Sequence, residues 1–268
     1  MKYVIKETIT IKEYLKALNL SKALICRIKS NGDFLVNGQH QTVRYLLQPQ
    51  DILEIILPQE TSSIIPNDIE LNIVYEDQHY LIIDKPSNLP VIPTKRYPDH
   101  TLSNGIINYY QKNNIHATVH LVNRLDKDTQ GLMLVAKDSY SHYLLSRNIK
   151  QVKRVYLCLV DGIMQGQGTI NQPIIKDKDS VKRLVDDNGK PSITHYQVIK
   201  QLDNQTLVKC ILETGRTHQI RVHLAYLNHP LSGDNLYGSK TNCDIYLDSV
   251  ELAFINPYTK KKIEIKKR

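Results

Sequence analysis

The sequence predicts an α+β protein with two domains: a small α/β domain at the N-terminus and a larger domain built on a mixed, mainly antiparallel sheet. Two observations predict this fold class. Beyond residue 70, short strand-like runs and helical segments mix irregularly, without the regular strand–helix repeat of a parallel α/β fold. Before them, a stretch rich in turn residues contains two prolines and suits a linker. We therefore expect domains at residues 1–58 and 70–268, joined by a linker at residues 59–69.

The N-terminal domain has the signals of two short helices and a small sheet. Thr10 and Glu13 have the spacing of a capping box, followed by apolar residues at helical spacing. Ser21 is a candidate N-cap for a second helix, which Gly32 ends. Strand-like runs follow at residues 34–36 and 52–57.

The larger domain is predicted mainly as short strands. We expect strands at residues 71–75, 80–84, 132–136, 155–160, 193–199 and 206–212. We expect helices between them at residues 102–111, 139–149 and 217–227. This order favours an antiparallel sheet with helices packed on it.

The composition is that of a folded chain with an excess of positive charge. Hydrophobic residues make up 41% and charged residues 23%, far from the composition of disordered chains. The 35 Lys and Arg against 27 Asp and Glu give a formal net charge of +8, which attracts phosphate backbones or anionic membranes without naming a partner.

We expect a cytoplasmic protein without membrane association. The first residues lack the apolar core of a signal peptide, and no run approaches the roughly 18 apolar residues of a membrane span. The four cysteines are far apart and lack zinc-type spacing, which is typical of thiols in a reducing compartment. They are Cys26, Cys158, Cys210 and Cys243.

Residues 121–137 carry the most chemical information. Asp126 stands in an Arg-Leu-Asp loop that leads through a polar turn and Gly131 into an apolar strand, so rigid sheet anchors its carboxylate. Taken alone, Asp126 or Asp128 is more often a residue that caps a turn than a catalytic one.

Three further segments accompany this loop. They are Lys85-Pro86 after an apolar strand, residues 153–162 with Tyr156, and residues 212–224 with a tail through Gly238. In this order the four segments resemble the K-P-x-G, H-R-L-D-x-x-T-S-G-L, K-x-Y-x-A-x-V-x-G and L-x-T-G-R-T-H-Q-I-R-x-H motifs of the RluA-type RNA pseudouridine synthases, including the RluC- and RluD-like enzymes. The resemblance implies a pseudouridine synthase fold and an isomerase that converts uridine within RNA to pseudouridine.

The resemblance also implies a role for individual residues. Asp126 is the essential catalytic carboxylate, and Arg221 pairs with it and keeps it ionised. Tyr156 offers an aromatic face to the detached uracil and a phenol for the proton on carbon 5. Arg124 enters the RNA and fills the place of the flipped base. A salt bridge within the loop is the alternative role for Arg124, and strand packing the alternative for Tyr156. Attack on the ribose, attack on the ring and a glycal-like intermediate all remain open for the carboxylate.

No metal or cofactor is expected. His218 and His223 lie beside Arg216, and we interpret all three as hydrogen-bond donors that fix the loop, with Arg216 also among the RNA-binding residues. The histidines do not have the H-E-x-x-H spacing of a zinc site, and no glycine-rich phosphate loop is present.

The N-terminal domain resembles the small ribosomal-protein-type RNA-binding module that often precedes such catalytic domains. The resemblance rests on the helix with Lys22, Arg27 and Lys29 and on the strand and turn at residues 34–38. It implies RNA binding, and a solvated basic helix face is the alternative.

The sequence departs from the family pattern at three positions. Asn123 stands where the family usually has His, Gln130 where it has Ser, and Asn88 where it has Gly. These departures leave the RNA target open: large-subunit ribosomal RNA is the usual substrate, and transfer RNA is the alternative. We expect a monomer. The rival functions are an inactive RNA or ribosome-assembly binding factor and a metal-dependent RNA hydrolase.

Overall fold

The computed structural model describes residues 1–267, which divide into two compact units after Thr61. This division falls inside the segment expected to be a linker. From Ile65 onward that segment belongs to the second unit, because Asn104 Nδ2 of helix α3 (Leu102–Lys112) donates to Ile65 O at 2.7 Å and Asn67 N donates to Asn104 O at 3.2 Å.

The first unit contains the two predicted helices and a four-stranded sheet. Thr10 and Glu13 form the capping box of α1, and Ser21 Oγ accepts from Leu24 N at 3.1 Å at the start of α2. Gly32 ends α2, and a Cβ there would lie 2.2 Å from the carbonyl oxygen of Ile56. The elements are β1 (Lys2–Val4), β2 (Ile9–Thr10), α1 (Ile11–Ala17), α2 (Lys22–Asn31), β3 (Asp33–Val36), β4 (Gln39–His40), β5 (Leu46–Leu47) and β6 (Ile52–Ile56), and the sheet order is β1-β6-β3-β4.

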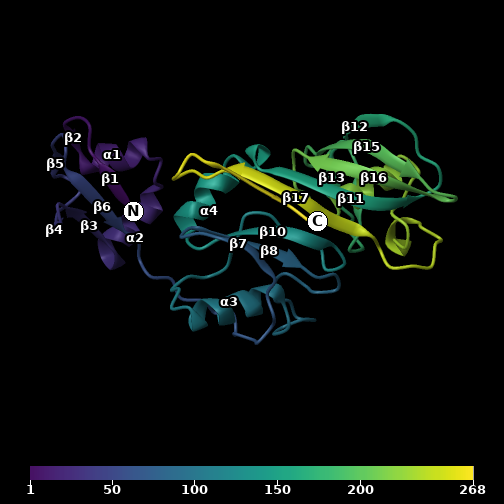
Figure 1. The fold of residues 1–268 in the computed structure, drawn as a ribbon, viewed down its shortest axis with the longest axis horizontal. Helices are drawn as coiled ribbons and strands as arrows, with labels where there is room; N and C mark the ends of the chain where they lie inside the picture. Colours follow the sequence, from purple (N-terminus) through teal and green to yellow (C-terminus); the bar gives the residue numbers. More distant parts are fainter. Residues whose placement is uncertain (268) are drawn as a thin grey trace. The chain divides into compact units, whose positions relative to one another are not determined.

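The second unit is built on one large mixed sheet, drawn in Figure 1. Its strands run in the order β12-β15-β16-β11-β17-β10-β8-β7, with β18 paired to β17 and β9 to β10. Within the described residues only the pairing of β10 with β17 is parallel, so the α+β prediction with a mainly antiparallel sheet is confirmed. The strands are β7 (Ile73–Glu76), β8 (Tyr80–Lys85), β9 (His120–Leu121), β10 (Gln130–Ala136), β11 (Lys153–Asp161), β12 (Gln167–Asn171), β15 (Ile193–Gln201), β16 (Gln205–Leu212), β17 (Leu247–Ile255) and β18 (Lys262–Lys266).

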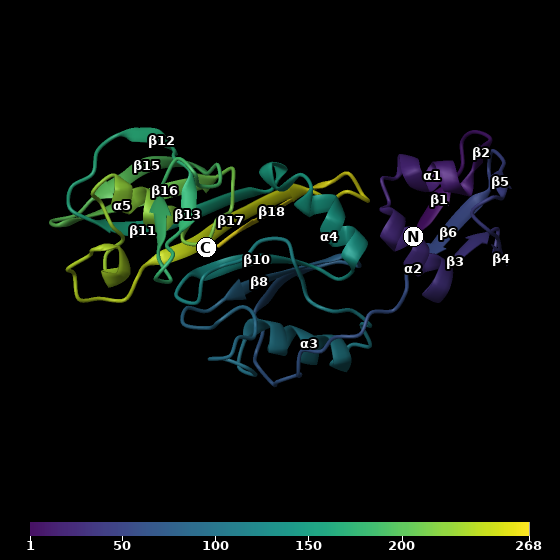
Figure 2. The ribbon, with the colours of Figure 1, turned by 180° about the vertical axis from the view of Figure 1, so that it is seen from behind.

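Helices cover both faces of this sheet. Alternate residues of β8 point to opposite faces, so Leu81 and Ile83 join one core and Tyr80 and Ile82 another. Helices α3 and α5 (Gln219–Tyr226) pack on the first face, and α4 (Ser139–Ser146) packs on the second. Figure 2, from behind, shows α5 against the β15–β16 end of the sheet. Each fully buried Leu or Ile side chain of these cores contributes roughly 1.5–3 kcal/mol.

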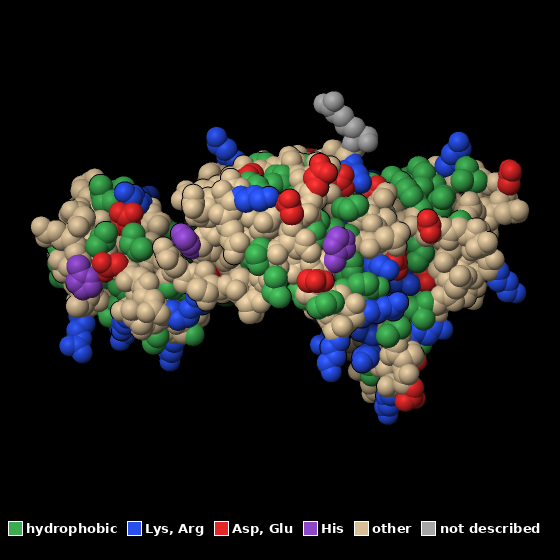
Figure 3. Space-filling view, turned by 90° about the horizontal axis from the view of Figure 1, so that it is seen from below, with side chains coloured by type: hydrophobic (Ala, Val, Ile, Leu, Met, Phe, Trp, Pro, Cys, Tyr) green, Lys and Arg blue, Asp and Glu red, His purple; other side chains and the backbone are tan. Residues whose placement is uncertain are grey.

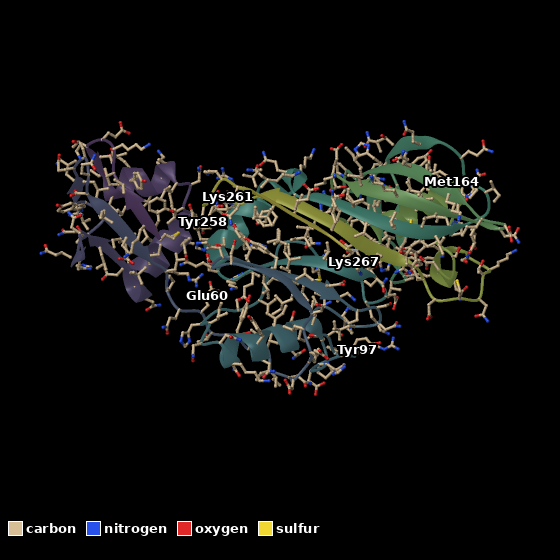
Figure 4. All side chains as sticks on the ribbon, in the orientation of Figure 1. Glu60, Tyr97, Met164, Tyr258, Lys261 and Lys267 are labelled. Carbon is tan, nitrogen blue, oxygen red and sulfur yellow. The ribbon has the colours of Figure 1, made fainter. Side chains whose placement is uncertain are left out.

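The structure differs from the sequence prediction in several elements. Helix α4 ends at Ser146, not at residue 149, and α5 begins at Gln219, because His218 is left-handed with φ 58°. The central strand β17 was not predicted, since its buried Asp248 interrupts the apolar pattern. Lys267 Nζ, labelled in Figure 4, donates to Asp248 Oδ1 at 3.0 Å, which makes that burial tolerable. A further hairpin, β13 (Ile174–Lys176) with β14 (Arg183–Val185), was also missed.

The pairing of β8 with β10 brings two sequence motifs together. Lys85 at the end of β8 lies opposite Gly131 in β10. Gly131 has φ +106°, and a Cβ there would lie 2.4 Å from Asp248 Oδ1, so only glycine fits between β10 and β17. The loop before Gly131 therefore enters the sheet beside the Lys85-Pro86 turn.

Candidate active site

The loop that precedes β10 holds Asp126 in a fixed position. Asn123 Oδ1 accepts from Leu134 N at 2.7 Å and ties the start of the loop to the sheet. The buried Lys85 Nζ donates to three backbone carbonyls, including that of Lys127 at 3.0 Å. The side chain of Asp126 keeps 28% of its surface exposed. Main-chain and side-chain contacts thus fix the loop and leave the carboxylate free to react.

A cavity of about 730 Å³ opens in front of this carboxylate. Loops before α3 and β10, strand β11 and the start of α5 line it. Every site residue predicted in the second unit lies on its wall. These residues are Arg124, Asp126, Tyr156, Arg216 and Arg221.

Tyr156 lies in β11 with only 4% of its surface exposed. Burial raises the pKa of the phenol above its ordinary range, although the nearby charge of Arg154 acts in the opposite direction. The phenol is therefore protonated near neutral pH. Tyr156 thus offers an aromatic surface and a hydroxyl donor, and it must lose its own proton before it can take one from a substrate.

The predicted pair of Arg221 with Asp126 is wrong at the level of direct contact. Arg221 Nε and Nη2 donate to the two carboxylate oxygens of Asp234 at 2.6 and 2.8 Å. Both side chains are almost fully buried. A bidentate pair of this kind uses one whole edge of the guanidinium, and Asp234 reaches that edge from the turn after α5.

Asp126 still acts on Arg221 through its charge. Burial by itself would lower the pKa of Arg221, but the hydrogen bonds and charge of Asp234, together with the charge of Asp126, raise it above its ordinary value. Arg221 is thus a permanent cation that Asp234 holds near Asp126.

His218 lies beside Asp126, with its Nε2 3.9 Å from Asp126 Oδ2. His218 Nδ1 lies 2.8 Å from the hydroxyl of Tyr237, which itself accepts from Arg183 N at 2.9 Å. The Tyr237 hydroxyl is then left to donate to Nδ1, which places the imidazole hydrogen on Nε2, facing Asp126. Burial lowers the pKa of His218, and the charges of Arg221 and Arg183 lower it further against the opposing effect of Asp126. The imidazole is therefore neutral near pH 7.

Exposed cations surround the cavity mouth. Figure 3 shows Lys and Arg side chains gathering on this part of the second unit. Tyr97, labelled in Figure 4, has Arg96 and Lys127 at 5.4 and 5.3 Å from its ring centre. Cations beside an aromatic ring on a cavity rim suit a ligand with phosphates and planar bases. The exposed cations of the rim are Arg96, Arg124, Lys127 and Arg216.

Residues 79–226 match the family model described as RNA pseudouridylate synthase. The chain belongs to this family. The synthase is 44% identical over 264 residues to the uncharacterized RNA pseudouridine synthase YjbO of Bacillus subtilis, which covers 95% of this chain and 93% of that relative. It is 40% identical over 217 residues to the ribosomal large subunit pseudouridine synthase D of Xanthomonas campestris, covering 79% of this chain and 65% of that one.

Solved structures share the fold of a large part of the chain. Human RNA Pseudouridylate Synthase Domain Containing 1 has a TM-score of 0.60 and 23% identity, covering 78% of this chain and 86% of the human chain. The fold and the family together identify the protein as an isomerase that converts uridine in RNA to pseudouridine.

The three predicted RNA-binding residues of the first unit differ in their surroundings. Lys22, Arg27 and Lys29 are all exposed on α2 of the synthase. Seven residues separate the two lysines, so they share one face of the helix, whereas Arg27 points elsewhere. Arg27 Nη2 lies 3.3 Å from Glu60 Oε1, and this ion pair partly neutralises the charge of Arg27.

The other expectations concern absences. No three His, Cys, Asp or Glu side chains within residues 1–267 are placed to hold a metal ion. His223 is bonded to Thr194 Oγ1 at 2.8 Å and to the carbonyl of Gln172 at 3.0 Å, which agrees with a loop-fixing role. None of the described helices is both long and apolar enough to span a bilayer.

Sequence reasoning missed several residues of the site. Asp234 and Tyr237 belong to the tail through Gly238 and received no role, because nothing in the spacing shows that the chain returns to α5. Arg154 received no role either, although it lies two residues before Tyr156 and therefore on the same face of β11. Lys85 received no role beyond its motif. Its burial beside the Asp126 loop becomes visible only in the structure.

Proposed function

We propose that this synthase isomerises uridines of large-subunit ribosomal RNA and that Asp126 is the catalytic carboxylate. The observation that supports the role of Asp126 most directly is its place: a partly exposed carboxylate on a fixed loop, in a cavity with the buried ring of Tyr156. The name of the Xanthomonas relative supports the ribosomal target.

The reaction needs a carboxylate next to a base that has left its helix. The bond between N1 and C1′ breaks, the uracil turns, and a bond between C5 and C1′ forms. The proton on C5 leaves and N1 ends protonated, so the atoms of substrate and product are the same. Asp126 serves this change as a nucleophile or as a base, and Tyr156 supports the loose ring.

Binding must expose the base before the chemistry starts. Flipping costs a few kcal/mol, which contacts elsewhere must offset. Arg124 is exposed at the cavity mouth, two residues before Asp126, and takes the place of the flipped base. The first unit adds RNA affinity through Lys22 and Lys29, whose charges share one face of α2.

Substitution of Asp126 by Asn tests the catalytic role. We expect the release of tritium from RNA labelled at carbon 5 of uridine to fall at least about a thousandfold, within the range of nucleophilic and acid–base contributions. RNA affinity, measured by filter binding, should change less than about threefold, because the side chains have the same shape. Turnover of purified Asp126→Asn near the wild-type rate would contradict this role.

The ribosomal address is tested separately. Pseudouridines are mapped in total RNA from cells with and without the gene, and at least one large-subunit position should lose its modification. A loss confined to transfer RNA would overturn the ribosomal target but not the activity. No tritium release by the wild-type protein on any cellular RNA would favour the inactive binding factor.

A further inference from the structure

Arg154 is a buried cation in the cavity that the proposed mechanism does not use. It lies two residues before Tyr156 in β11, and only 2% of its surface is exposed. Nε donates to the carbonyl of Val152 at 3.1 Å, and Nη2 donates to the carbonyls of Leu212 and Glu213, both at 3.0 Å. These carbonyls hold the guanidinium in one orientation.

No carboxylate balances this charge. Within residues 1–267 Arg154 has no Asp or Glu oxygen inside 4.0 Å, in contrast to Arg221 with its bidentate Asp234. Burial lowers the pKa of Arg154, yet a guanidinium stays protonated in proteins, so the site carries an unneutralised positive charge. A buried charge without a counter-ion is costly, and an anionic ligand would reduce that cost.

The remaining nitrogen, Nη1, belongs to a side chain that lines the cavity. It donates to no acceptor in the described part of the chain, and it lies 3.0 Å from the place where a Cβ on Gly215 would stand. Gly215 and Arg216 are exposed and line the same cavity wall as Arg154. The absence of a side chain at Gly215 keeps this direction open.

We propose that Arg154 Nη1 binds a phosphate oxygen beside the target uridine and so sets the position of the nucleotide against Asp126 and Tyr156. This inference rests on the proposed function, because it assumes an RNA substrate in this cavity. An uncompensated cation favours a charged phosphate over a neutral uracil carbonyl. Since the carbonyls already fix the guanidinium, binding orders it no further, whereas the exposed Arg216 must lose side-chain freedom.

Gly215→Ala tests the open direction without removing the cation. The added methyl would sit 3.0 Å from Nη1 in a site with little room to yield, and it would block an oxygen from reaching that nitrogen. We expect kcat/KM for pseudouridine formation to fall about tenfold to a hundredfold, the value of one hydrogen bond to a charged group. Arg154→Lys keeps the charge but not the planar guanidinium. Its kcat/KM should lie between those of Gly215→Ala and Arg154→Met.

The matched control is Lys150→Met. Lys150 is exposed and lies 3.8 Å from Glu213, but it does not line the cavity. The Lys150→Met variant removes one positive charge from the same region, so it separates a general loss of charge from the loss of a specific contact. We expect a change of less than about twofold in kcat/KM, as for an ordinary surface charge.

The acceptor is identified with RNAs that carry a methylphosphonate at one phosphate flanking the target uridine. In the wild-type protein one such substitution should lower kcat/KM and affinity by the factor seen for Arg154→Met. In Arg154→Met the same substitution should cause no further loss, which is the signature of a shared contact in a double-mutant cycle. Losses that add at every flanking phosphate would overturn phosphate binding. If a 4-thiouridine or 2-thiouridine target instead shows the non-additive loss, a uracil carbonyl is the partner.

Folding is monitored for every variant by circular dichroism. If Arg154→Met does not fold, Gly215→Ala and Arg154→Lys carry the same cycle, and wild-type rates and affinities in both would overturn the inference. Failure of the proposed function is recognised differently, because the wild-type protein would then release no tritium. Equilibrium binding of the methylphosphonate RNAs still reports the phosphate contact in that case.

Discussion

The cavity of the second unit and helix α2 of the first unit hold their cations in different ways. Arg154 and Arg221 are 2% and 6% exposed, and carbonyls or a carboxylate fix each guanidinium. Lys22 and Lys29 are exposed, and neither makes an ion pair with residues 1–267. Burial of the cavity cations lowers the stability of the fold but fixes their positions, whereas the lysines of α2 stay hydrated and mobile.

This difference separates two contributions to RNA modification. A fixed, buried charge needs no reorganisation when the substrate binds and reacts, so its loss should reduce kcat/KM with little dependence on salt. An exposed lysine attracts phosphates from a flexible side chain, so its loss should reduce affinity in a way that depends on salt. Variants of both kinds test whether the two groups of cations contribute in these different ways.

The largest effect is expected for Asp234→Asn. It leaves Arg221 buried without its carboxylate, which should lower the free energy of unfolding by about 3–5 kcal/mol. The rate of pseudouridine formation should fall as well, because Arg221 then loses the contacts that fix its guanidinium. Urea unfolding followed by circular dichroism and single-turnover kinetics measure the two effects.

A double variant is the control for this prediction. Asp234→Asn with Arg221→Met removes both charges and should recover part of the stability but none of the activity, because the Arg221 guanidinium is then absent from the site. If Asp234→Asn alone costs less than about 1 kcal/mol, the pair is not a rigid support, and Arg221 does not belong with the fixed cations.

The Arg221–Asp234 pair also shows what sequence reasoning could reach. The motifs placed Arg124, Asp126, Tyr156, Arg216 and Arg221 on one cavity, because the family resemblance keeps these segments together. The partner of Arg221 was mistaken, because a contact between α5 and a later turn depends on how the chain returns after the helix. Resemblance therefore located the residues of the site better than it located their pairs.

The same limit applies to the fold. Apolar alternation found β11 and β16, whose alternate buried residues, such as Cys158 and Val208, face one core. It missed the equally central β17, where the polar Asp248 and Ser249 are buried, with 6% and 0% exposed. Their hydrogen bonds come from strands and side chains far away in sequence, including Gln130 and Lys267. A buried polar pair of this kind looks like a surface segment until its partners are known.

An intermediate effect is expected at Lys85, a third buried cation, and it depends on pH. Burial lowers the pKa of Lys85 from its ordinary 10.5 to about 8. Between these values the unfolded chain binds more protons than the folded one, so this group makes the protein more stable as pH rises. The unfolding free energy of the wild type relative to Lys85→Met should increase by up to about 3 kcal/mol across this window.

Urea unfolding of both proteins between pH 7 and pH 10 checks this sign. The comparison with Lys85→Met removes the effect of tyrosines and other lysines that titrate in both proteins. A difference that stays constant with pH would mean that Lys85 is not desolvated in the native protein. The three carbonyls that accept from Lys85 Nζ would then compensate fully for the loss of water around its charge.

The smallest effect is expected for the double variant Lys22→Gln with Lys29→Gln. RNA affinity should fall a few-fold near physiological salt, and the slope of log K against log salt should become shallower by about 1 to 2, according to the number of phosphates lost. The rate at saturating RNA should not change, because neither lysine lies in the cavity.

The control is Lys12→Gln with Lys16→Gln, which removes the same charge from exposed positions of α1. Equal effects of the two double variants would show that α2 contributes only to the net charge of the unit. A larger effect of the α2 variant at low salt, confined to affinity, would assign RNA binding to that face of the helix and preserve the contrast with Arg154.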